Sequence, residues 1–269
     1  MKALVMGATG NVGGELVAAL LARDVTVRAV SRRERDWPAG VEGIQADVNA
    51  PDGLVGAAAD VDAAYVMSGY PAEAGLLSAL PPGAHVAVLS SSSAPLGDGG
   101  NAMGGYHLAT ERAVQASGRP WTTVRPCSMQ SNLLRWREQL ERGDLVTAPF
   151  GDVPTAMVDP ADVAAVIALA LTEPGHDGRV YRLSGPRPLT PGDQVAVLAA
   201  ALGRELRFEA IPDDEARDQL AADYADAMFE IYREHPELES EVQDTIASVL
   251  GRPAGTLEAW ISRHRVQLT

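Results

Sequence analysis

Hydrophobic positions along the first half of the chain fall into short, nearly continuous runs separated by longer amphipathic segments. Six of these runs predict β-strands: 3–6, 25–30, 41–46, 63–67, 85–90 and 121–125. Four segments between them have the spacing of helices: 11–22, 51–59, 72–80 and 103–117. Continuously apolar strands are typical of a parallel sheet that is covered on both faces. The alternation of strand and helix therefore predicts an α/β protein with a doubly wound parallel Rossmann sheet.

The pattern becomes less regular after residue 126. Three later segments have helical spacing: 131–143, 155–171 and 191–203. The middle one has a clear start, because Asp159 is suited to cap a helix and Pro160 to occupy its first turn. Asp162 would then lie near the positive end of the helix dipole. The acidic segment 213–244 predicts a solvated helical face.

This change of pattern predicts two domains. The Rossmann domain would comprise residues 1–126 together with about 156–175. A smaller, mostly helical lobe on the substrate side would comprise about 127–155 and 176–269.

Composition and charge exclude several classes of function. The 269 residues carry a net charge of −14, whereas proteins that bind nucleic acids or acidic membranes concentrate Lys and Arg. The single cysteine, Cys127, leaves no partner for an internal disulfide and fits a reducing compartment. The chain opens on a strand rather than a signal peptide, and no apolar run approaches the ~18 residues of a membrane span. We therefore expect a cytoplasmic monomer or homodimer that binds neither nucleic acid nor a membrane.

The stretch "VMGATGNVGG" places Gly7, Gly10 and Gly13 directly after the first strand and at the start of the first helix. Glycines in this position let the backbone turn sharply and approach a pyrophosphate, which the free N–H groups of the helix attract. The alternative is a tight strand–helix turn without a ligand. The position within a run of strand–helix units favours a dinucleotide-binding loop.

The second strand ends in "AVSRRERD", where an NAD-binding site usually has an acid for the ribose 2′-hydroxyl. This chain has Ser31, Arg32 and Arg33 instead, and a guanidinium pairs with a 2′-phosphate in bidentate geometry. We therefore predict that NADP(H) is favoured over NAD(H), with a solvated turn as the alternative. Asp47 and Val48 follow the third strand, where the adenine would lie, although Asp47 would also suit an ordinary turn.

Several motifs together resemble the NmrA-like family of atypical short-chain dehydrogenase/reductases. They are "GATGNVGG", "VSRR", "ADVNAP", "YHLATERAVQASGRPWTTVRP" and "DPADVAAVIALAL". The resemblance implies an NAD(P)-binding Rossmann fold whose small C-terminal lobe closes a substrate cleft. The family includes NADPH-dependent quinone and azo-type reductases, reductases of plant phenolics, and non-catalytic redox sensors that bind a regulatory partner.

The resemblance also implies positions for the cofactor. The pyrophosphate would be lined by Gly7, Thr9, Gly10, Asn11, Val12 and Gly13. The 2′-phosphate would meet Arg32, and Asp47 and Val48 would flank the adenine. The remaining contacts expected along the cofactor are Met67, Ser68, Gly69, Ser90, Pro126 and Cys127, the last two beside the nicotinamide.

Tyr106 and Ser92 are the candidate catalytic residues. In extended members of the superfamily a Ser or Thr after the fifth strand polarises the substrate carbonyl, and Ser92 in "LSSSSAPLG" matches that position best. Tyr106 would donate a proton as hydride arrives. A Lys four residues later normally lowers the pKa of this Tyr, but here the residue is Thr110. An unassisted Tyr, with a pKa near ~10, still donates a proton but is a poor base, so reduction is less affected than alcohol oxidation.

Structural interpretations compete with these catalytic roles. A serine run after a strand often only caps and turns the chain, and Tyr106 packing on the cofactor without proton transfer is the other alternative. Adjacent helix positions point about 100° apart, so we do not expect His107 to share the cleft with Tyr106. Cys127 is expected to pack rather than attack, and the scattered histidines predict no metal site.

The combined features predict an NADPH-dependent oxidoreductase that transfers hydride to a small electron-poor acceptor, such as a quinone, an enone or another conjugated carbonyl. Five residues are candidates for an apolar wall around this acceptor: Met103, Met129, Trp136, Phe150 and Met157. One alternative is a non-catalytic NADP(H)-binding redox sensor that acts through a protein partner, which the missing Lys favours. Another is a non-redox isomerase or lyase on the same fold.

Overall fold

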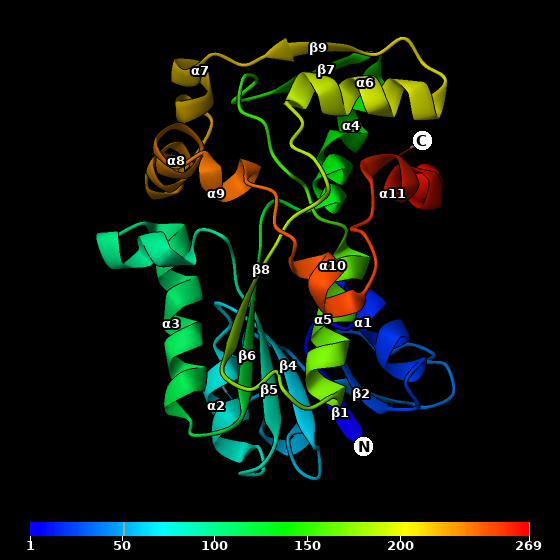
Figure 1. Ribbon diagram of the computed structural model, residues 1–269, viewed down its shortest axis with the longest axis vertical. Helices are drawn as coiled ribbons and strands as arrows, with labels where there is room; N and C mark the ends of the chain where they lie inside the picture. The colour runs from blue at the N-terminus through cyan, green and yellow to red at the C-terminus, as the bar shows by residue number, and fades with distance from the viewer. Residues whose placement is uncertain (51, 269) are drawn as a thin grey trace.

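The computed structural model describes residues 1–50 and 52–268, and a seven-stranded sheet with a smaller lobe at one end dominates it (Figure 1). The strands of the sheet are β1 (Lys2–Val5), β2 (Thr26–Ser31), β3 (Val41–Gln45), β4 (Ala63–Met67), β5 (His85–Leu89), β6 (Trp121–Pro126) and β8 (Arg179–Leu183). Their order is β3-β2-β1-β4-β5-β6-β8, and every pairing is parallel. The predicted doubly wound Rossmann sheet is confirmed, and its strand order reverses between β1 and β4.

Helices cover both faces of the sheet (Figure 1). One face carries α1 (Asn11–Leu21), α5 (Pro160–Thr172) and α10 (Thr245–Leu250), and the other carries α2 (Ala72–Ala79) and α3 (Ala102–Ala116). Alternate residues of β1 serve the two cores: Ala3 and Val5 pack toward α1 and α5, while Leu4 packs toward α2. This double burial is the reason for the continuous apolar runs in the sequence.

The lobe lies beyond the carboxyl ends of the strands (Figure 1). It contains a small parallel pair of strands, β7 (Leu145–Ala148) and β9 (Arg207–Ala210). Its helices are α4 (Arg137–Arg142), α6 (Pro191–Leu202), α7 (Asp213–Asp218), α8 (Ala222–Phe229), α9 (Glu237–Ser240) and α11 (Leu257–His264). The 3₁₀ helices of the chain are η1 (Val55–Ala57), η2 (Ala94–Gly99), η3 (Gln130–Trp136) and η5 (Arg265–Gln267), and η4 (Glu230–Glu234) is a π-helix.

Helix boundaries follow the predicted signals in the second half of the chain. The Asp159 carboxylate accepts the N–H of Ala161 at 2.9 Å and caps α5, which begins at Pro160. Helix α6 ends at Gly203, whose φ of +68° is in the left-handed region. The predicted helix 131–143 forms, but as the 3₁₀ helix η3 followed by α4.

The predicted helix 51–59 is wrong over most of its length. Pro51 lies outside the described residues, and only Val55–Ala57 form a 3₁₀ turn. A Cβ at Gly53 would lie 2.4 Å from the carbonyl oxygen of Asp47, so the chain folds tightly there. Two glycines in a short segment weaken a helix, because glycine loses more backbone entropy on folding than other residues do.

Strand β8 was missed by the sequence pattern. Residues 179–183 pair with β6 in the large sheet, although the predicted boundary placed everything from 176 onward in the lobe. The strand "RVYRL" lies at the sheet edge, and its first two residues are exposed, so it lacks a buried strand's apolar run. For residues 179–183 the domain boundary is corrected; the rest of the predicted division stays a prediction.

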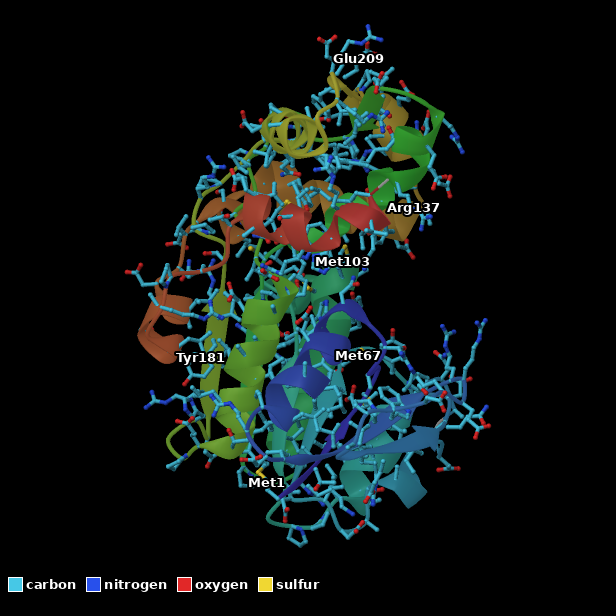
Figure 2. The ribbon with its side chains drawn as sticks, turned by 90° about the vertical axis from the view of Figure 1, so that its right-hand side faces the viewer. Met1, Met67, Met103, Arg137, Tyr181 and Glu209 are labelled. Carbon is cyan, nitrogen blue, oxygen red and sulfur yellow. The ribbon has the colours of Figure 1, made fainter. Side chains whose placement is uncertain are left out.

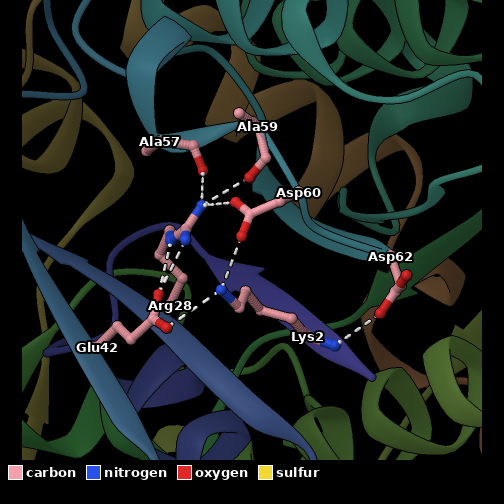
Figure 3. A network of polar contacts seen from close by, with 7 residues as sticks. All are labelled: Lys2, Arg28, Glu42, Ala57, Ala59, Asp60 and Asp62. Atoms are coloured by element: carbon pink, nitrogen blue, oxygen red, sulfur yellow. Dashed lines mark hydrogen bonds and ion pairs between the residues drawn. The ribbon is translucent and has the colours of Figure 1, made fainter.

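A polar network joins β1, β2 and β3 to the turn before β4 (Figure 3). The Arg28 side chain of β2 is buried and donates to Glu42 of β3 at 2.8 and 3.1 Å and to Asp60 at 2.9 Å. The same guanidinium donates to the carbonyl oxygens of Ala57 at 3.0 Å and Ala59 at 2.7 Å. One arginine thereby satisfies the backbone of an irregular segment and ties it to the sheet.

Candidate active site

The three predicted loop glycines each meet a steric demand. Gly7 has a φ of +58°, and a Cβ there would lie 2.6 Å from the Met67 side chain. A Cβ at Gly13 would lie 2.1 Å from the carbonyl oxygen of Gly7. Gly10 is the N-cap of α1 and offers no side-chain hydrogen bond, so the first N–H groups of the helix are open to a ligand. The loop has the form that a pyrophosphate requires.

A cavity of about 220 Å³ opens at this loop. Thr9, Gly10 and Asn11 line it together with Ser131 and Trp260, which come from η3 and α11. Of the other residues predicted for the pyrophosphate, Val12 and Gly13 are buried beneath the loop. Contact with the cofactor stays a prediction for all six residues of this group, and the geometry suits the three that face the cavity.

Both arginines after β2 are exposed and available to a ligand. Neither Arg32 nor Arg33 forms an ion pair with another described residue. Ser31 is buried, and its hydroxyl donates to the carbonyl oxygen of Arg33 at 2.7 Å, which fixes the turn. The Asp47 carboxylate accepts the backbone N–H of Asn49 at 2.9 Å. This bond, with the nearby charge of Arg32, holds the pKa of Asp47 below its ordinary value.

A cavity of about 430 Å³ extends from the ends of β4, β5 and β6 to the lobe. The predicted site residues on its wall are Met67, Ser68, Ser90, Tyr106, Pro126 and Cys127. Figure 2 shows Met67 at the end of the sheet and Met103, which also lines this cavity, toward the lobe. Gly69 lies beneath the Tyr106 ring, where a Cβ would be 2.9 Å from the ring carbon Cδ2. The cavity lies at the carboxyl ends of the strands, where α/β folds bind their ligands.

Tyr106 and His107 both line this cavity, so the expectation that only one of them would do so is wrong. Their ring centroids are 4.2 Å apart, because long aromatic side chains bridge the angle between neighbouring helix positions. Partial burial raises the pKa of Tyr106 above its ordinary value. Burial lowers the pKa of His107 to about 4, and its buried Nδ1 has no hydrogen-bond partner among the described residues. Both groups therefore face the cavity uncharged at neutral pH.

Thr110, at the position of the usual Lys, is hydrogen-bonded to the loop that follows β4. Its hydroxyl accepts the N–H of Gly69 at 3.2 Å and donates to the Glu73 carboxylate at 2.6 Å. Burial raises the pKa of Glu73. Thr110 is itself buried, so it holds this loop against α3 and brings no charge to Tyr106.

Ser92 is not among the residues that line the cavity beside the strands. It is buried off the cavity wall, and its hydroxyl donates to the Glu239 carboxylate at 2.5 Å. Ser90, Ser91 and Ser93 line the cavity, and Ser90 donates to the buried Glu111. A catalytic role for Ser92 stays a prediction that this hydrogen bond does not favour.

Glu239 is a site residue that the sequence pattern missed. It belongs to the acidic segment expected to form a solvated face, yet it is 5% exposed and lines the cavity beside the strands. Its carboxylate also accepts the backbone N–H of Ser128 at 2.7 Å. Burial raises its pKa. No local signal in the sequence marks it, because its partners lie more than a hundred residues away.

A third cavity, of about 330 Å³, lies within the lobe next to the cavity at the strand ends. Its wall includes Trp136, Phe150 and Met157, while Met103 and Met129 line the cavity beside the strands. All five residues predicted for an apolar wall therefore lie on one cavity or the other. The two cavities adjoin, because they share the wall residues Ser128, Asn132, Arg135, Tyr224, Met228 and Tyr232.

The Cys127 thiol is 6% exposed and donates to the carbonyl oxygen of Ala156 at 2.7 Å. Burial raises its pKa well above the ordinary value, which disfavours the thiolate. Over residues 1–50 and 52–268 no group of three or more His, Cys, Asp or Glu side chains is arranged to hold a metal ion. None of the helices in that part of the chain is both long and apolar enough to span a membrane.

The parallel sheet, the glycine loop and the cavity at the strand ends define a Rossmann-type dinucleotide-binding protein. The NAD(P)H-binding family matches residues 7–174. The (4-alkanoyl-5-oxo-2,5-dihydrofuran-3-yl)methyl phosphate reductase of Streptomyces griseus is 36% identical, and the NAD(P)H azoreductase of Xenophilus azovorans 31% identical, each over 97% of both chains. The NADPH complex of the Escherichia coli quinone oxidoreductase QOR2 superposes with a TM-score of 0.77 at 23% identity, covering 98% of this chain and 99% of that one.

The chain belongs to the NAD(P)H-binding, NmrA-like family of atypical short-chain dehydrogenase/reductases. It is an NAD(P)H-dependent reductase of this type. The predicted family, fold class and enzyme class are confirmed, and among the predicted alternatives the reductase is favoured over the redox sensor and the non-redox enzyme.

Proposed function

We propose that this protein uses NADPH to reduce a small conjugated carbonyl acceptor, either an enone or a quinone. The observation that carries the proposal is the pair of adjoining cavities, one at Pro126 and Cys127 and the other apolar and aromatic within the lobe. A flat conjugated acceptor fits such a wall: the Phe150 ring stacks on Tyr232 with centroids 4.8 Å apart, and both line the lobe cavity.

The relatives support the same acceptor class. One reduces an oxo-dihydrofuran that carries an alkanoyl group, and a solved neighbour of the same fold is a quinone oxidoreductase. Activated acceptors of this kind need a position beside the cofactor and a hydrogen bond to the oxygen, rather than a strong protein base.

NADPH supplies the hydride when bound, and the residues of the chain hold it. The exposed Arg32 and Arg33 would bind the 2′-phosphate, and the open N–H groups of the glycine loop would bind the pyrophosphate. This arrangement supports NADPH over NADH. Asp47, Val48 and Ser68 complete the proposed binding surface.

Tyr106 would donate the proton that accompanies reduction. Its raised pKa keeps the hydroxyl protonated at neutral pH, and it lines the cavity that also reaches Pro126 and Cys127. The position of the usual lysine is held by Thr110, whose hydroxyl is hydrogen-bonded to Glu73. No positive charge at that position therefore lowers the pKa of Tyr106. The site therefore favours reduction over the reverse oxidation of an alcohol.

The test is a panel assay with purified protein, NADPH and four acceptors: 1,4-naphthoquinone, a cyclic enone, an unsaturated lactone and an azo dye. Loss of the reduced nicotinamide absorbance measures turnover. We expect reduction of at least one of the three carbonyl acceptors. Turnover of the azo dye alone would overturn the proposed acceptor class and leave the reductase class intact.

A further inference from the structure

Arg135 lies where the two cavities meet. It belongs to η3 and lines both the cavity at the strand ends and the cavity of the lobe. Its Nε donates to the carbonyl oxygen of Asn132 at 3.2 Å, which orients the guanidinium from behind. Arg135 is exposed, and its two terminal nitrogens form no hydrogen bond or ion pair with a described residue, so both are available to a ligand at the junction.

This lack of a partner distinguishes Arg135 from its neighbours. Arg137 pairs with Glu141 at 2.9 Å, and Arg142 pairs with Glu138 at 3.1 Å, each along its own helix. In a chain with a net charge of −14, carboxylates are plentiful, yet none is placed against Arg135. It is the only charged side chain among the described residues that line the lobe cavity.

The one acidic side chain on these cavity walls among the described residues, Glu239, forms no ion pair with Arg135. Glu239 lines the cavity at the strand ends, but its carboxylate is occupied by the Ser92 hydroxyl and the Ser128 N–H. Burial and the charge of Glu239 raise the pKa of Tyr232, which lies on the wall that the two cavities share, and the charge of Arg135 opposes this rise less strongly. Arg135 is the one Lys or Arg side chain among the described residues that line the two cavities.

We infer that Arg135 binds an oxyanion carried by the acceptor, a carboxylate, sulfonate or phosphate group, and thereby selects anionic conjugated acceptors over neutral ones. A guanidinium with both terminal nitrogens free matches two oxygens of such a group in bidentate geometry. The conjugated part would face Pro126 and Cys127, with the oxyanion at the junction and any apolar remainder in the lobe cavity. This inference rests on the proposed reductase function for the reaction it concerns.

The first experiment compares 1,4-naphthoquinone with 1,4-naphthoquinone-2-sulfonate. The measured quantity is the ratio of kcat/KM for the anionic quinone to that for the neutral one, with NADPH saturating. In Arg135→Gln we expect this ratio to fall by about tenfold or more, because a charge-assisted bidentate contact is lost. Arg137, which Figure 2 labels, is exposed as Arg135 is but lines neither cavity. Arg137→Gln is therefore the matched control, and its ratio should equal that of the wild type. An unchanged ratio in Arg135→Gln would overturn the inference.

A second measurement does not depend on turnover. Naphthalene-2-sulfonate and the neutral 2-naphthyl methyl sulfone are titrated calorimetrically into the protein loaded with NADP⁺. We expect the wild type and Arg137→Gln to prefer the sulfonate, and Arg135→Gln to lose that preference. A wild type that binds neither ligand, or binds both equally, would overturn the inference. If neither quinone is reduced while sulfonate binding still depends on Arg135, quinones are excluded as acceptors and the anion site stands.

Discussion

Tyr106 keeps its proton, and this decides how the reaction should respond to pH. Its pKa is raised above the ordinary value near 10, while the pKa of His107 is lowered to about 4. Neither group changes its charge between about pH 6 and about pH 9. We therefore expect kcat for quinone reduction to be flat over this range when followed by nicotinamide absorbance.

Removal of the Tyr106 hydroxyl should slow the chemical step. Tyr106→Phe keeps the ring over Gly69 but loses the donor, and we expect kcat to fall roughly 10- to 100-fold with little change in KM for NADPH. Tyr181→Phe is the control, because Tyr181 lies on the edge strand β8, its hydroxyl is hydrogen-bonded to His176, and it lines neither cavity. A rate in Tyr106→Phe equal to that of this control would mean that Tyr106 only packs.

Arg32 should set the choice between the two cofactors. Its guanidinium is exposed and unpaired, so Arg32→Ala removes a charged donor without leaving a buried group unsatisfied. We expect KM for NADPH to rise about 10- to 100-fold, the range of a charge-assisted hydrogen bond, and KM for NADH to change less than about threefold.

Arg35→Ala is the matched control for Arg32. Arg35 lies in the same loop, so its replacement by Ala removes the same positive charge as Arg32→Ala does. Its guanidinium lies over the Trp37 ring, 4.8 Å from the ring centroid. Steady-state kinetics with both cofactors decide the outcome. An equal rise of both KM values in Arg32→Ala would contradict a 2′-phosphate contact.

Sequence reasoning reached the cavity residues whose role depends on local backbone or on apolar character. Gly7 and Gly13 are legible because their steric demands lie within one loop. Glu239 and Arg135 were not identified, since what matters about each is a distant partner or the lack of one. The sequence around a glutamate in an acidic segment, or around an arginine in a charged helix, does not show whether that side chain lines a cavity.

At the level of elements, the buried strands were predictable, and of the more exposed strands only β3 was predicted. β1, β4 and β5 are buried on both faces, so their sequences are nearly continuous apolar runs that are recognised as strands of a parallel sheet. β7, β8 and β9 are short, partly exposed strands whose pairing is set by tertiary contacts. The helix caps at Asp159 and Gly203 act within a few residues and were read correctly.

The network around Arg28 makes a prediction about how β2 is anchored. Arg28→Met would leave the buried carbonyl oxygen of Ala57 without its donor and would leave Glu42 paired with Lys2 alone. We expect a loss of about 2 kcal/mol in the free energy of unfolding, because an unsatisfied buried acceptor costs roughly 1–3 kcal/mol. Urea denaturation measures this loss.

A surface ion pair supplies the comparison for Arg28. Arg23 pairs with Glu173 at 2.7 Å, with both side chains substantially exposed, and Arg23→Met should change stability by less than about 0.5 kcal/mol. If the two substitutions cost the same, the carbonyl contacts of Arg28 contribute nothing beyond a surface pair.

Across the whole molecule, the lobe and the sheet are joined by buried polar contacts as well as by the chain. Asn101, which caps α3, donates to the carbonyl oxygen of Ala227 at 3.1 Å and to Glu230 at 2.8 Å. Glu239 joins the lobe to the ends of β5 and β6 through Ser92 and Ser128. The chain also leaves the sheet for the lobe after β6, returns to the sheet at α5 and β8, and leaves it again before α6, so we expect neither part to unfold without disturbing the other.

This coupling predicts how the molecule responds to its cofactor. A ligand at 100 times its Kd stabilises the folded state by about 2.7 kcal/mol, so NADPH at that level should raise Tm by roughly 5–10 °C. Calorimetric scans should show one transition that moves as a unit, since the loop and the cavity walls come from both parts of the chain. NADH at the same concentration should move Tm less, because it has no 2′-phosphate for Arg32. Two transitions, of which NADPH shifts only one, would mean that the lobe folds independently of the sheet.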